Sequence, residues 1–425
     1  MTARKFAQVA KPPGRRKVHS SSELSHEGRD ASLAARDRTL MSNGMGGEFA
    51  TIQAKPPKAR FARGWHCLGL SEHFKSGEPK GLKIFGTELV VYRGESGEAH
   101  VLDGYCPHMG AALAKGCVKG EDVVCPFHAW KWGADGRCVE VPYAKRIPPK
   151  ARIRSWPTME LNQQLFVYND PEWNPPPPVV TPPAIEAVTD GDCLAWNWES
   201  IVVETNLREL IDNVSDSTHF YYVHGWVPTR FRNVFEGHIA AQYSEFQARN
   251  DVNFGDVDTS SDEFGFHNEG IYYGPAYMID YQRASYMGHT VHCWLINAHY
   301  AITENSFVLH CGVTTKRIPG LSEDENQAVC NSYAKAARDS FFEDVNIWRH
   351  KVRVDNPLLT ENDGPVYQLR RWYEQFYVDV KDIEPDMVAR FEKVVDLEAP
   401  HRRWEAEQRE SATSSQPEFA PEPAE

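Results

Sequence analysis

The chain has 425 residues, 41% of them hydrophobic, and is therefore long enough for about two domains with sizeable cores. Its net charge of −13 argues against nucleic-acid binding as the main role. No apolar run reaches the roughly 18 residues that a membrane span needs.

The two ends of the chain differ in composition from the rest. Residues 1–58 are polar and basic and lack a periodic apolar pattern, which predicts a disordered extension. Residues 411–425 are acidic and rich in Pro and Ser, which predicts a disordered tail. Seven of the nine cysteines show no paired spacing, so we expect free thiols and a reducing, cytoplasmic location.

The middle of the chain divides into two parts of different pattern. Residues 61–170 contain short apolar runs separated by Gly-containing turns, which predicts an all-β domain. Residues 171–189 are rich in proline, which cannot pair in a sheet, and are predicted to be a linker. Residues 190–400 form a second domain, with expected strands at 196–203, 272–281, 290–300 and 306–316 and expected helices at 206–219, 323–351, 365–380 and 384–395. The fold class that follows is α+β.

Two short motifs in the β domain each pair one cysteine with one histidine. Cys106-Pro-His108 is followed after sixteen residues by Cys125-Pro-Phe-His128. Two thiolates on one iron and two imidazoles on the other define a Rieske [2Fe–2S] cluster. Zinc is the structural alternative, but zinc fingers usually keep their cysteines together and their histidines together. The ligand order therefore predicts a Rieske cluster, which transfers electrons and performs no substrate chemistry by itself.

A second candidate metal site lies in the second domain, at His219 and His224. Residues five apart lie about 140° apart around a regular helix, so the two rings can share a metal only if the helix ends or is distorted between them. Gly225 and Pro228 follow at once, which fits a helix that terminates there. A non-haem iron(II) site needs two histidines and one carboxylate.

The carboxylate ligand is not given by proximity in the sequence. Glu343 and Asp344 stand beside large apolar residues in the long helix expected at 323–351. An acid on an apolar helix face is costly unless it is paired or binds a metal. The residues alone do not choose between these two acids. Asp216, three residues before His219, is either a helix-surface acid or a hydrogen-bond partner of an iron-bound imidazole.

The chain resembles the Rieske non-haem iron oxygenases, and among them the oxygenase components of 3-ketosteroid 9α-hydroxylases. The cluster motifs and the paired histidines are common to the wider family. Stretches typical of the ketosteroid branch are Asn233–Ile239, Asp355–Leu359 and Tyr367–Asp379. The resemblance implies a Rieske domain followed by a helix-grip catalytic domain, in which helices pack on an antiparallel sheet.

The resemblance also implies roles for individual residues. Asp344, rather than Glu343, would complete the iron site with His219 and His224. Asp216 would bridge a cluster histidine and an iron histidine across the interfaces of a head-to-tail homotrimer. Asn297 matches a polar residue near the iron.

The chain departs from the pattern of its resemblance at several places. Pro107 stands where we expect Arg, and Ala129-Trp-Lys-Trp132 stands where we expect Asp-Trp-Arg-Trp. Because proline has neither N–H nor charge, the cluster potential and reductase docking could differ. The stretches Gly225–Arg230 and Thr259–Gly270 are expected to face the substrate and to vary between paralogues.

The function that the resemblance implies is a monooxygenase acting in steroid degradation. It would hydroxylate a 3-ketosteroid at C9, or a steroid side-chain CoA thioester, with electrons from NAD(P)H through a separate flavin/iron–sulfur reductase. No Gly-x-Gly-x-x-Gly follows a strand, so we expect no nicotinamide site in this chain. The alternatives are a Rieske oxygenase for another apolar ring system, such as a sterol desaturase or aromatic dihydroxylase, and a plain electron carrier.

Overall fold

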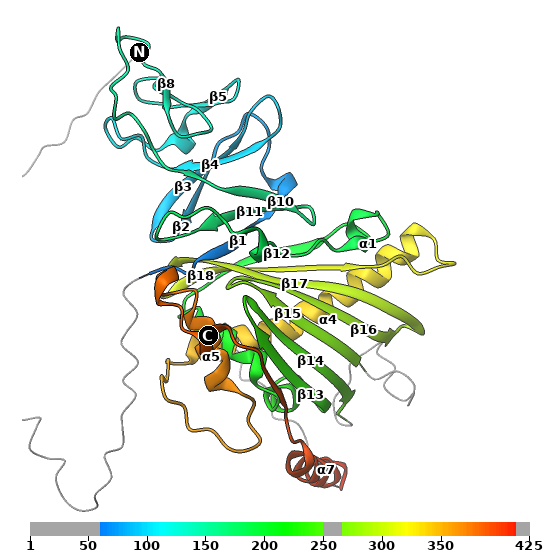
Figure 1. Ribbon diagram of the computed structural model, residues 1–425. Helices are drawn as coiled ribbons and strands as arrows, with labels where there is room; N and C mark the ends of the chain where they lie inside the picture. Colours follow the sequence, from blue (N-terminus) through cyan, green and yellow to red (C-terminus); the bar gives the residue numbers. More distant parts are fainter. Residues whose placement is uncertain (1–59, 250–265, 414–425) are drawn as a thin grey trace, which may run out of the picture. The chain divides into compact units, whose positions relative to one another are not determined.

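The computed structural model describes residues 60–249 and 266–413 (Figure 1). The predicted extension at 1–58 and residues 414–425 of the predicted tail lie outside these residues. Among the helices of the described residues, none is long and apolar enough to cross a membrane.

The first part of the described chain consists of three small antiparallel sheets. Their orders are β1-β11-β10, β2-β3-β4-β9 and β5-β6-β7-β8. The strands are β1 Gly64–Leu70, β2 Lys80–Ile84, β3 Thr87–Arg93, β4 Ala99–Asp103, β5 Cys117–Lys119, β6 Asp122–Val124, β7 Lys131–Trp132, β8 Cys138–Glu140, β9 Ser155–Trp156, β10 Thr158–Leu161 and β11 Gln164–Asn169. Within residues 61–170 the regular structure is thus strands with two short 3₁₀ turns, as expected for an all-β segment.

The predicted linker at 171–189 is packed against its neighbours. It contains the 3₁₀ turn η3 Pro178–Val180 and the short helix α1 Glu186–Thr189. Ile185 and Val188 are buried in one apolar cluster with Tyr277 and Ile296 of the large sheet. This segment therefore contributes to a core, in addition to joining the two parts of the chain.

The second part is built on one eight-stranded antiparallel sheet of order β12-β18-β17-β16-β15-β14-β13-β19. Its strands are β12 Asn197–Val203, β13 Trp226–Glu236, β14 Ile239–Ala248, β15 Phe266–Tyr273, β16 Tyr277–Tyr286, β17 His289–Thr303, β18 Ser306–Thr315 and β19 Phe391–Val394. Helix α4, Glu323–His350, lies across one face of the sheet (Figure 1). A capping box formed by Ser322 and Glu325 fixes its start. This is the sheet-and-helix arrangement that the resemblance implied.

Four of the expected elements are confirmed, and others are wrong. β12, β17, β18 and α4 match the segments expected at 196–203, 290–300, 306–316 and 323–351. The single strand expected at 272–281 is interrupted by a turn at 274–276, so that its ends belong to β15 and β16; Gly274 adopts a φ of 82° there, which suits glycine.

The helices expected near the C-terminal end also differ. Helix α5, Val366–Glu374, is shorter than the segment expected at 365–380 and is followed by a 3₁₀ turn, η5, Val380–Asp382. The helix expected at 384–395 ends after α6, Pro385–Val388, and the chain then adds β19 to the edge of the sheet. Helix α7, Glu398–Thr413, was not predicted and extends into the segment expected to be a disordered tail.

Candidate metal centres and active site

The first candidate metal centre is formed by two loops with the same backbone path. Cys106 follows β4, and Cys125 follows β6 directly. In each loop the residue four positions later donates its N–H to the cysteine carbonyl, Gly110 at 2.8 Å and Ala129 at 3.1 Å. Both residues have positive φ, 77° for Gly110 and 57° for Ala129. Both loops thus close with the same left-handed turn.

The four side chains of these loops offer suitable donors for a cluster. Cys106 and Cys125 are buried and are free thiols. Burial raises the pKa of the Cys106 thiol to about 11, and the adjacent Cys125 adds to this effect. The rings of His108 and His128 lie with centroids 4.7 Å apart, and His128 Nδ1 is buried with no hydrogen-bond partner among the described residues. Two thiols and two imidazoles with a buried, unused nitrogen fit a Rieske cluster.

His108 is exposed, and an aromatic neighbour fixes its orientation. Its ring stacks on Trp130 with centroids 4.6 Å apart and an interplanar angle of 10°. Trp130 Nε1 in turn donates a hydrogen bond to the Tyr143 hydroxyl at 2.7 Å. Pro107, also exposed, stands between the two ligands of this loop and offers no N–H to a cluster.

The helix expected at 206–219 is broken at Asp216. It consists of α2 Arg208–Asp212, the 3₁₀ turn η4 Asn213–Ser215 and, after a break, α3 His219–Tyr222. Asp216 is extended, and its Oδ1 accepts hydrogen bonds from the N–H of Thr218 at 3.0 Å and of His219 at 3.2 Å. An aspartate that bonds to the backbone ahead of it starts a new turn instead of continuing the helix. The new turn presents the two histidines.

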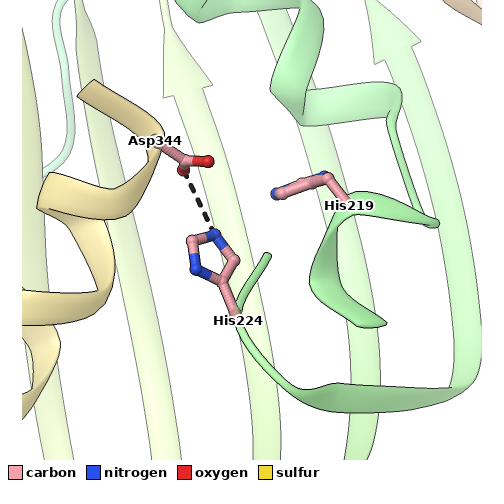
Figure 2. A group of neighbouring side chains, drawn as sticks. All are labelled: His219, His224 and Asp344. Atoms are coloured by element: carbon pink, nitrogen blue, oxygen red, sulfur yellow. Dashed lines mark ion pairs between the residues drawn. The ribbon is translucent and has the colours of Figure 1, made fainter. Parts of the chain in front are cut away.

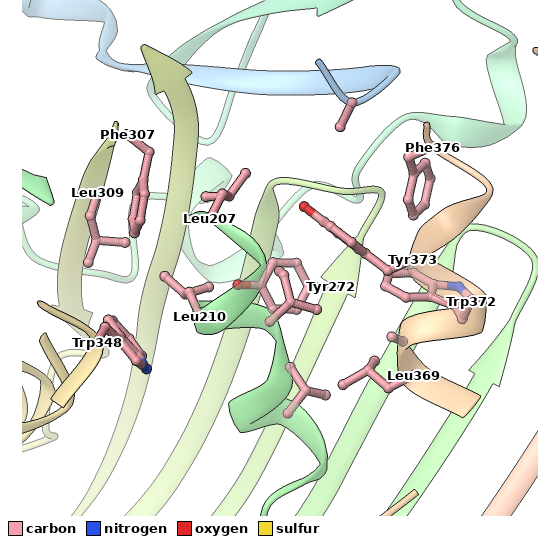
Figure 3. Close-up of a cluster of buried hydrophobic side chains, with 14 of the residues drawn as sticks. Leu207, Leu210, Tyr272, Phe307, Leu309, Trp348, Leu369, Trp372, Tyr373 and Phe376 are labelled. Atoms are coloured by element: carbon pink, nitrogen blue, oxygen red, sulfur yellow. The ribbon is translucent and has the colours of Figure 1, made fainter. Parts of the chain in front are cut away.

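A close backbone contact and an apolar cluster hold this segment in place. A Cβ on Gly364 would lie 1.5 Å from the carbonyl oxygen of Ser215, so only glycine permits this approach. Leu207 and Leu210, which lie at and just after the start of α2, are buried in a cluster with Trp348 of α4 (Figure 3). The cluster therefore positions α2 and α4, the elements next to the histidines and the acids.

His219, His224 and Asp344 are brought together as the resemblance implied. One ligand atom from each lies within 4.8 Å of the others. The two rings and the carboxylate point toward one another from α3, from the turn after α3 and from α4 (Figure 2). Helix α3 ends at Tyr222, between the two histidines, as the spacing required. His219 Nδ1 is buried without a hydrogen-bond partner among the described residues and lies on the side of Asp216, 3.8 Å from its Oδ1.

The structure distinguishes Asp344 from Glu343. Asp344 Oδ2 lies 3.3 Å from His224 Nε2, and its side chain is 10% exposed. Glu343 Oε2 lies 3.0 Å from the other ring nitrogen, Nδ1, and its side chain is 51% exposed. Ser340 Oγ also contacts Nδ1, at 3.1 Å. Asp344 thus lies on the side of the ring where a metal would be held, whereas Glu343 and Ser340 orient the ring from the other side.

The charges around the site favour a protonated His224 when no metal is present. Burial lowers the pKa of His224, but the carboxylates of Asp344 and Glu343 outweigh burial and raise this pKa above its ordinary value. A divalent cation would replace that proton. The combination of one buried carboxylate and two convergent imidazoles is the donor set that non-haem iron uses.

Asp216 lies beside the site without entering it. Its Oδ1 is 3.8 Å from His219 Nδ1, beyond hydrogen-bond length, and its side chain is 44% exposed. Burial raises the pKa of Asp216, but the His219 ring and the hydrogen bonds from His219 and Thr218 hold it well below the ordinary value. Asp216 is thus a carboxylate, and one of its oxygens already accepts hydrogen bonds from the backbone of the turn that follows it.

The three candidate ligands line a cavity of about 220 Å³ between α4 and the sheet. Its walls are mostly apolar and include Trp226, Phe266 and Met278. Asn297, on β17, lines it with a buried Oδ1 that has no hydrogen-bond partner among the described residues. None of the four cluster residues is among those that line it.

The two stretches expected to face the substrate contribute to this wall in part. Trp226 comes from the stretch Gly225–Arg230, and Phe266, Asn268 and Gly270 come from Thr259–Gly270. Residues 259–265 lie outside the described part of the chain. Sequence reasoning missed Ser340 and Gly364, because their roles depend on contacts with residues more than a hundred positions away.

Comparison with known proteins gives a consistent result. Residues 64–157 match the Rieske [2Fe–2S] domain, and residues 167–377 match the 3-ketosteroid 9α-hydroxylase C-terminal domain. The chain is 48% identical to a 3-ketosteroid-9-alpha-monooxygenase oxygenase component of Rhodococcus rhodochrous, over 85% of this chain and 94% of that protein. The corresponding protein of Mycobacterium tuberculosis is also 48% identical, over 84% of this chain and 92% of its own length.

Solved structures show the same fold at low identity. Dicamba monooxygenase bound to dicamba superposes with a TM-score of 0.61 at 20% identity, covering 75% of this chain and 98% of that one. The donor sets described above fit the two cofactors of such enzymes, a Rieske [2Fe–2S] cluster and a mononuclear non-haem iron. This chain belongs to the family of oxygenase components of 3-ketosteroid 9α-monooxygenases, which are Rieske non-haem iron monooxygenases.

Proposed function

We propose that this chain is the terminal oxygenase that hydroxylates a 3-ketosteroid at C9, or its side-chain CoA thioester. The observation that carries the proposal is the convergence of His219, His224 and Asp344 on one wall of an apolar cavity. The reaction consumes substrate, O₂, two electrons and two protons and yields hydroxylated product and water. An iron held by these three residues would supply the activation of O₂.

The residues around the ligands have separate tasks. Glu343 and Ser340 hold the His224 ring through Nδ1, so that Nε2 faces the metal position. The apolar wall excludes water from the bond that reacts. Asn297, with its unpartnered Oδ1 in the cavity, is a polar group that can accept a hydrogen bond there.

Cys106, His108, Cys125 and His128 would hold the cluster that delivers electrons. A separate reductase, which the description "oxygenase component" of the relatives implies, would load the cluster from NAD(P)H through flavin and iron–sulfur groups. The exposed His108 would be the point at which the reductase docks.

The cluster of one subunit would serve the iron of the next in a head-to-tail homotrimer. None of the four cluster residues lines the cavity of this chain, which fits a supply of electrons from the cluster of a neighbouring subunit. The partly exposed carboxylate of Asp216, next to His219, would connect the two centres across that interface. All nine cysteines are free thiols, which supports a reducing, cytoplasmic location.

Product analysis tests the proposal. The protein is incubated with a compatible reductase, NADH and a panel of 3-ketosteroids and their side-chain thioesters, and mass spectrometry and NMR locate any new hydroxyl. We expect a C9 hydroxyl on at least one member. NADH oxidation coupled only to a sterol lacking the 3-ketone, or to an aromatic ring, would overturn the steroid assignment. A protein with an intact cluster but no turnover of any substrate would be an electron carrier.

A further inference from the structure

A small polar group interrupts the apolar wall of the active-site cavity. It consists of Asn268 on β15 and Asp280 and Gln282 on β16, with Tyr333 of α4 packed against it. Asp280 and Gln282 are two positions apart on one strand and therefore face the same side of the sheet. None of these four residues is a candidate ligand of either metal centre.

Hydrogen bonds within the group leave one oxygen unused. The Tyr333 hydroxyl donates to Gln282 Oε1 at 3.0 Å, which orients the amide. Gln282 Nε2 then donates to Asp280 Oδ2 at 2.9 Å. Asp280 Oδ1 is buried and has no hydrogen-bond partner among the described residues. A buried polar atom without a partner is costly, so a bound molecule that supplies one is stabilised.

The surroundings of Asp280 stabilise the neutral acid relative to the carboxylate, compared with an aspartate in water. The residue is 6% exposed, and the residues that line the cavity include no Lys or Arg. Burial, with a smaller contribution from the negative charge of Glu269, outweighs the hydrogen bond from Gln282 and raises the pKa of Asp280 to about 7. A neutral carboxyl whose Oδ2 accepts from Gln282 carries its proton on Oδ1 and can donate it.

We propose that Asp280 donates a hydrogen bond from Oδ1 to a carbonyl oxygen of the substrate and so selects ketones over analogues that lack that carbonyl. The inference rests on the proposed steroid substrate and names the residue that recognises its keto group. Asp280 is thus a specificity-determining residue, held in place by Gln282 and Tyr333.

The placement along the cavity suits recognition at a distance from the reacting bond. Tyr333 and Asp344 lie on the same helix, about three turns or roughly 16 Å apart. Tyr333, which orients the polar group through Gln282, is therefore well separated from Asp344 along α4. A rigid, fused-ring substrate held there by its carbonyl presents a fixed part of its ring system to the metal site.

Two variants of the same size separate donation from simple packing. Asp280→Asn keeps a donor, because its amide can accept from Gln282 and donate through the other atom. Asp280→Leu keeps the branched shape and the number of side-chain heavy atoms and removes the donor. The assay measures KM and kcat for a ketosteroid that the wild type hydroxylates, and for analogues in which each carbonyl in turn is replaced by CH₂. Iron content and melting temperature confirm that both variants are folded and loaded.

For Asp280→Leu we expect KM for the ketone to rise on the order of tenfold, with little change in kcat. For the analogue that lacks the bound carbonyl, the KM values of the wild type and Asp280→Leu should be equal. That analogue therefore identifies the carbonyl that Asp280 binds. Asp280→Asn should keep the low KM. If the ratio of KM for the ketone to KM for each analogue were the same in the wild type and in both variants, the inference would be overturned.

The pH profile supplies an independent readout. Three ionisable groups act on Asp280 electrostatically: Cys293 on β17, Tyr333 on α4 and, from the opposite face of the sheet, Glu269 on β15. Burial raises the pKa values of Cys293 and Tyr333 well above their ordinary values, so both stay protonated through neutrality. Wild-type KM for the ketone should rise roughly tenfold between pH 6 and 8 as Asp280 ionises, whereas KM of Asp280→Asn should stay flat.

The result also separates this inference from the proposed function. Identical pH profiles for the wild type and Asp280→Asn contradict the role of Asp280 and leave steroid hydroxylation intact. A wild type that turns over no ketosteroid contradicts the proposed function, and with it the inference.

Discussion

Replacing Asp344 and Glu343 one at a time should have very different effects on the mononuclear iron. Asp344 lies 3.3 Å from the inner nitrogen of His224, whereas Glu343 contacts the outer nitrogen at 3.0 Å together with Ser340. Asp344→Ala removes a ligand, so iron should fall from about three atoms per chain to about two, the cluster alone. Glu343→Gln removes only a charged partner of the ligand, so the site should bind iron about 10- to 100-fold more weakly.

That range corresponds to roughly 1.4–2.7 kcal/mol of binding free energy. Each variant is dialysed against graded chelator, and iron is counted by mass spectrometry while absorbance reports the cluster. Asp344→Ala should lack the third iron at every chelator concentration, and Glu343→Gln should lose it only at higher concentrations. If Glu343→Gln instead lacked the iron throughout and Asp344→Ala kept it, our assignment of the carboxylate ligand would be reversed.

Three further predictions concern the surroundings of the site. Gly364→Ala places a Cβ 1.5 Å from the Ser215 carbonyl oxygen, so the free energy of unfolding should fall by more than about 2 kcal/mol and the mononuclear iron should be lost, as calorimetry and iron analysis would show. The folded protein keeps the Asp280 proton up to a pH of about 7, while the unfolded chain loses it near the ordinary aspartate pKa of 3.8. Stability from this residue is therefore fully present below about pH 3.8 and is lost progressively as pH rises to about 7, by up to roughly 4 kcal/mol, and Asp280→Asn should show a flatter dependence in denaturant titrations. Asp216→Asn should keep both metal centres yet slow product formation in a single turnover from a reduced cluster. An unchanged rate would contradict its role between the centres.

The cluster ligands could be predicted from the sequence because each motif is local. Cys106 and His108 are two residues apart, and one tight loop is enough to bring them together. The third iron ligand could not be chosen in the same way. Glu343 and Asp344 are neighbours on one helix, and only the packing of α4 against the sheet decides which of them is buried. The resemblance to known oxygenases chose Asp344, and the geometry agrees.

Other features depended on contacts that the sequence pattern does not reveal. Asp216 sits in a stretch with helical periodicity, and its hydrogen bonds to the following backbone break that helix. The turn at Gly274 was hidden inside a long apolar run that reads as one strand. Once that turn is placed, the alternation along β16 brings Asp280 into the cavity, which is why this residue was not predicted.

The central claim is that a substrate steroid is hydroxylated at the iron held by His219, His224 and Asp344. The most direct test compares wild type with His219→Ala, each with an intact cluster, in a reaction with reductase, NADH, a 3-ketosteroid and ¹⁸O₂. Our account predicts a C9 hydroxyl labelled with ¹⁸O in the wild type, and, in His219→Ala, a cluster that is still reduced but no labelled product. Full turnover by His219→Ala, with unchanged iron content, would contradict it.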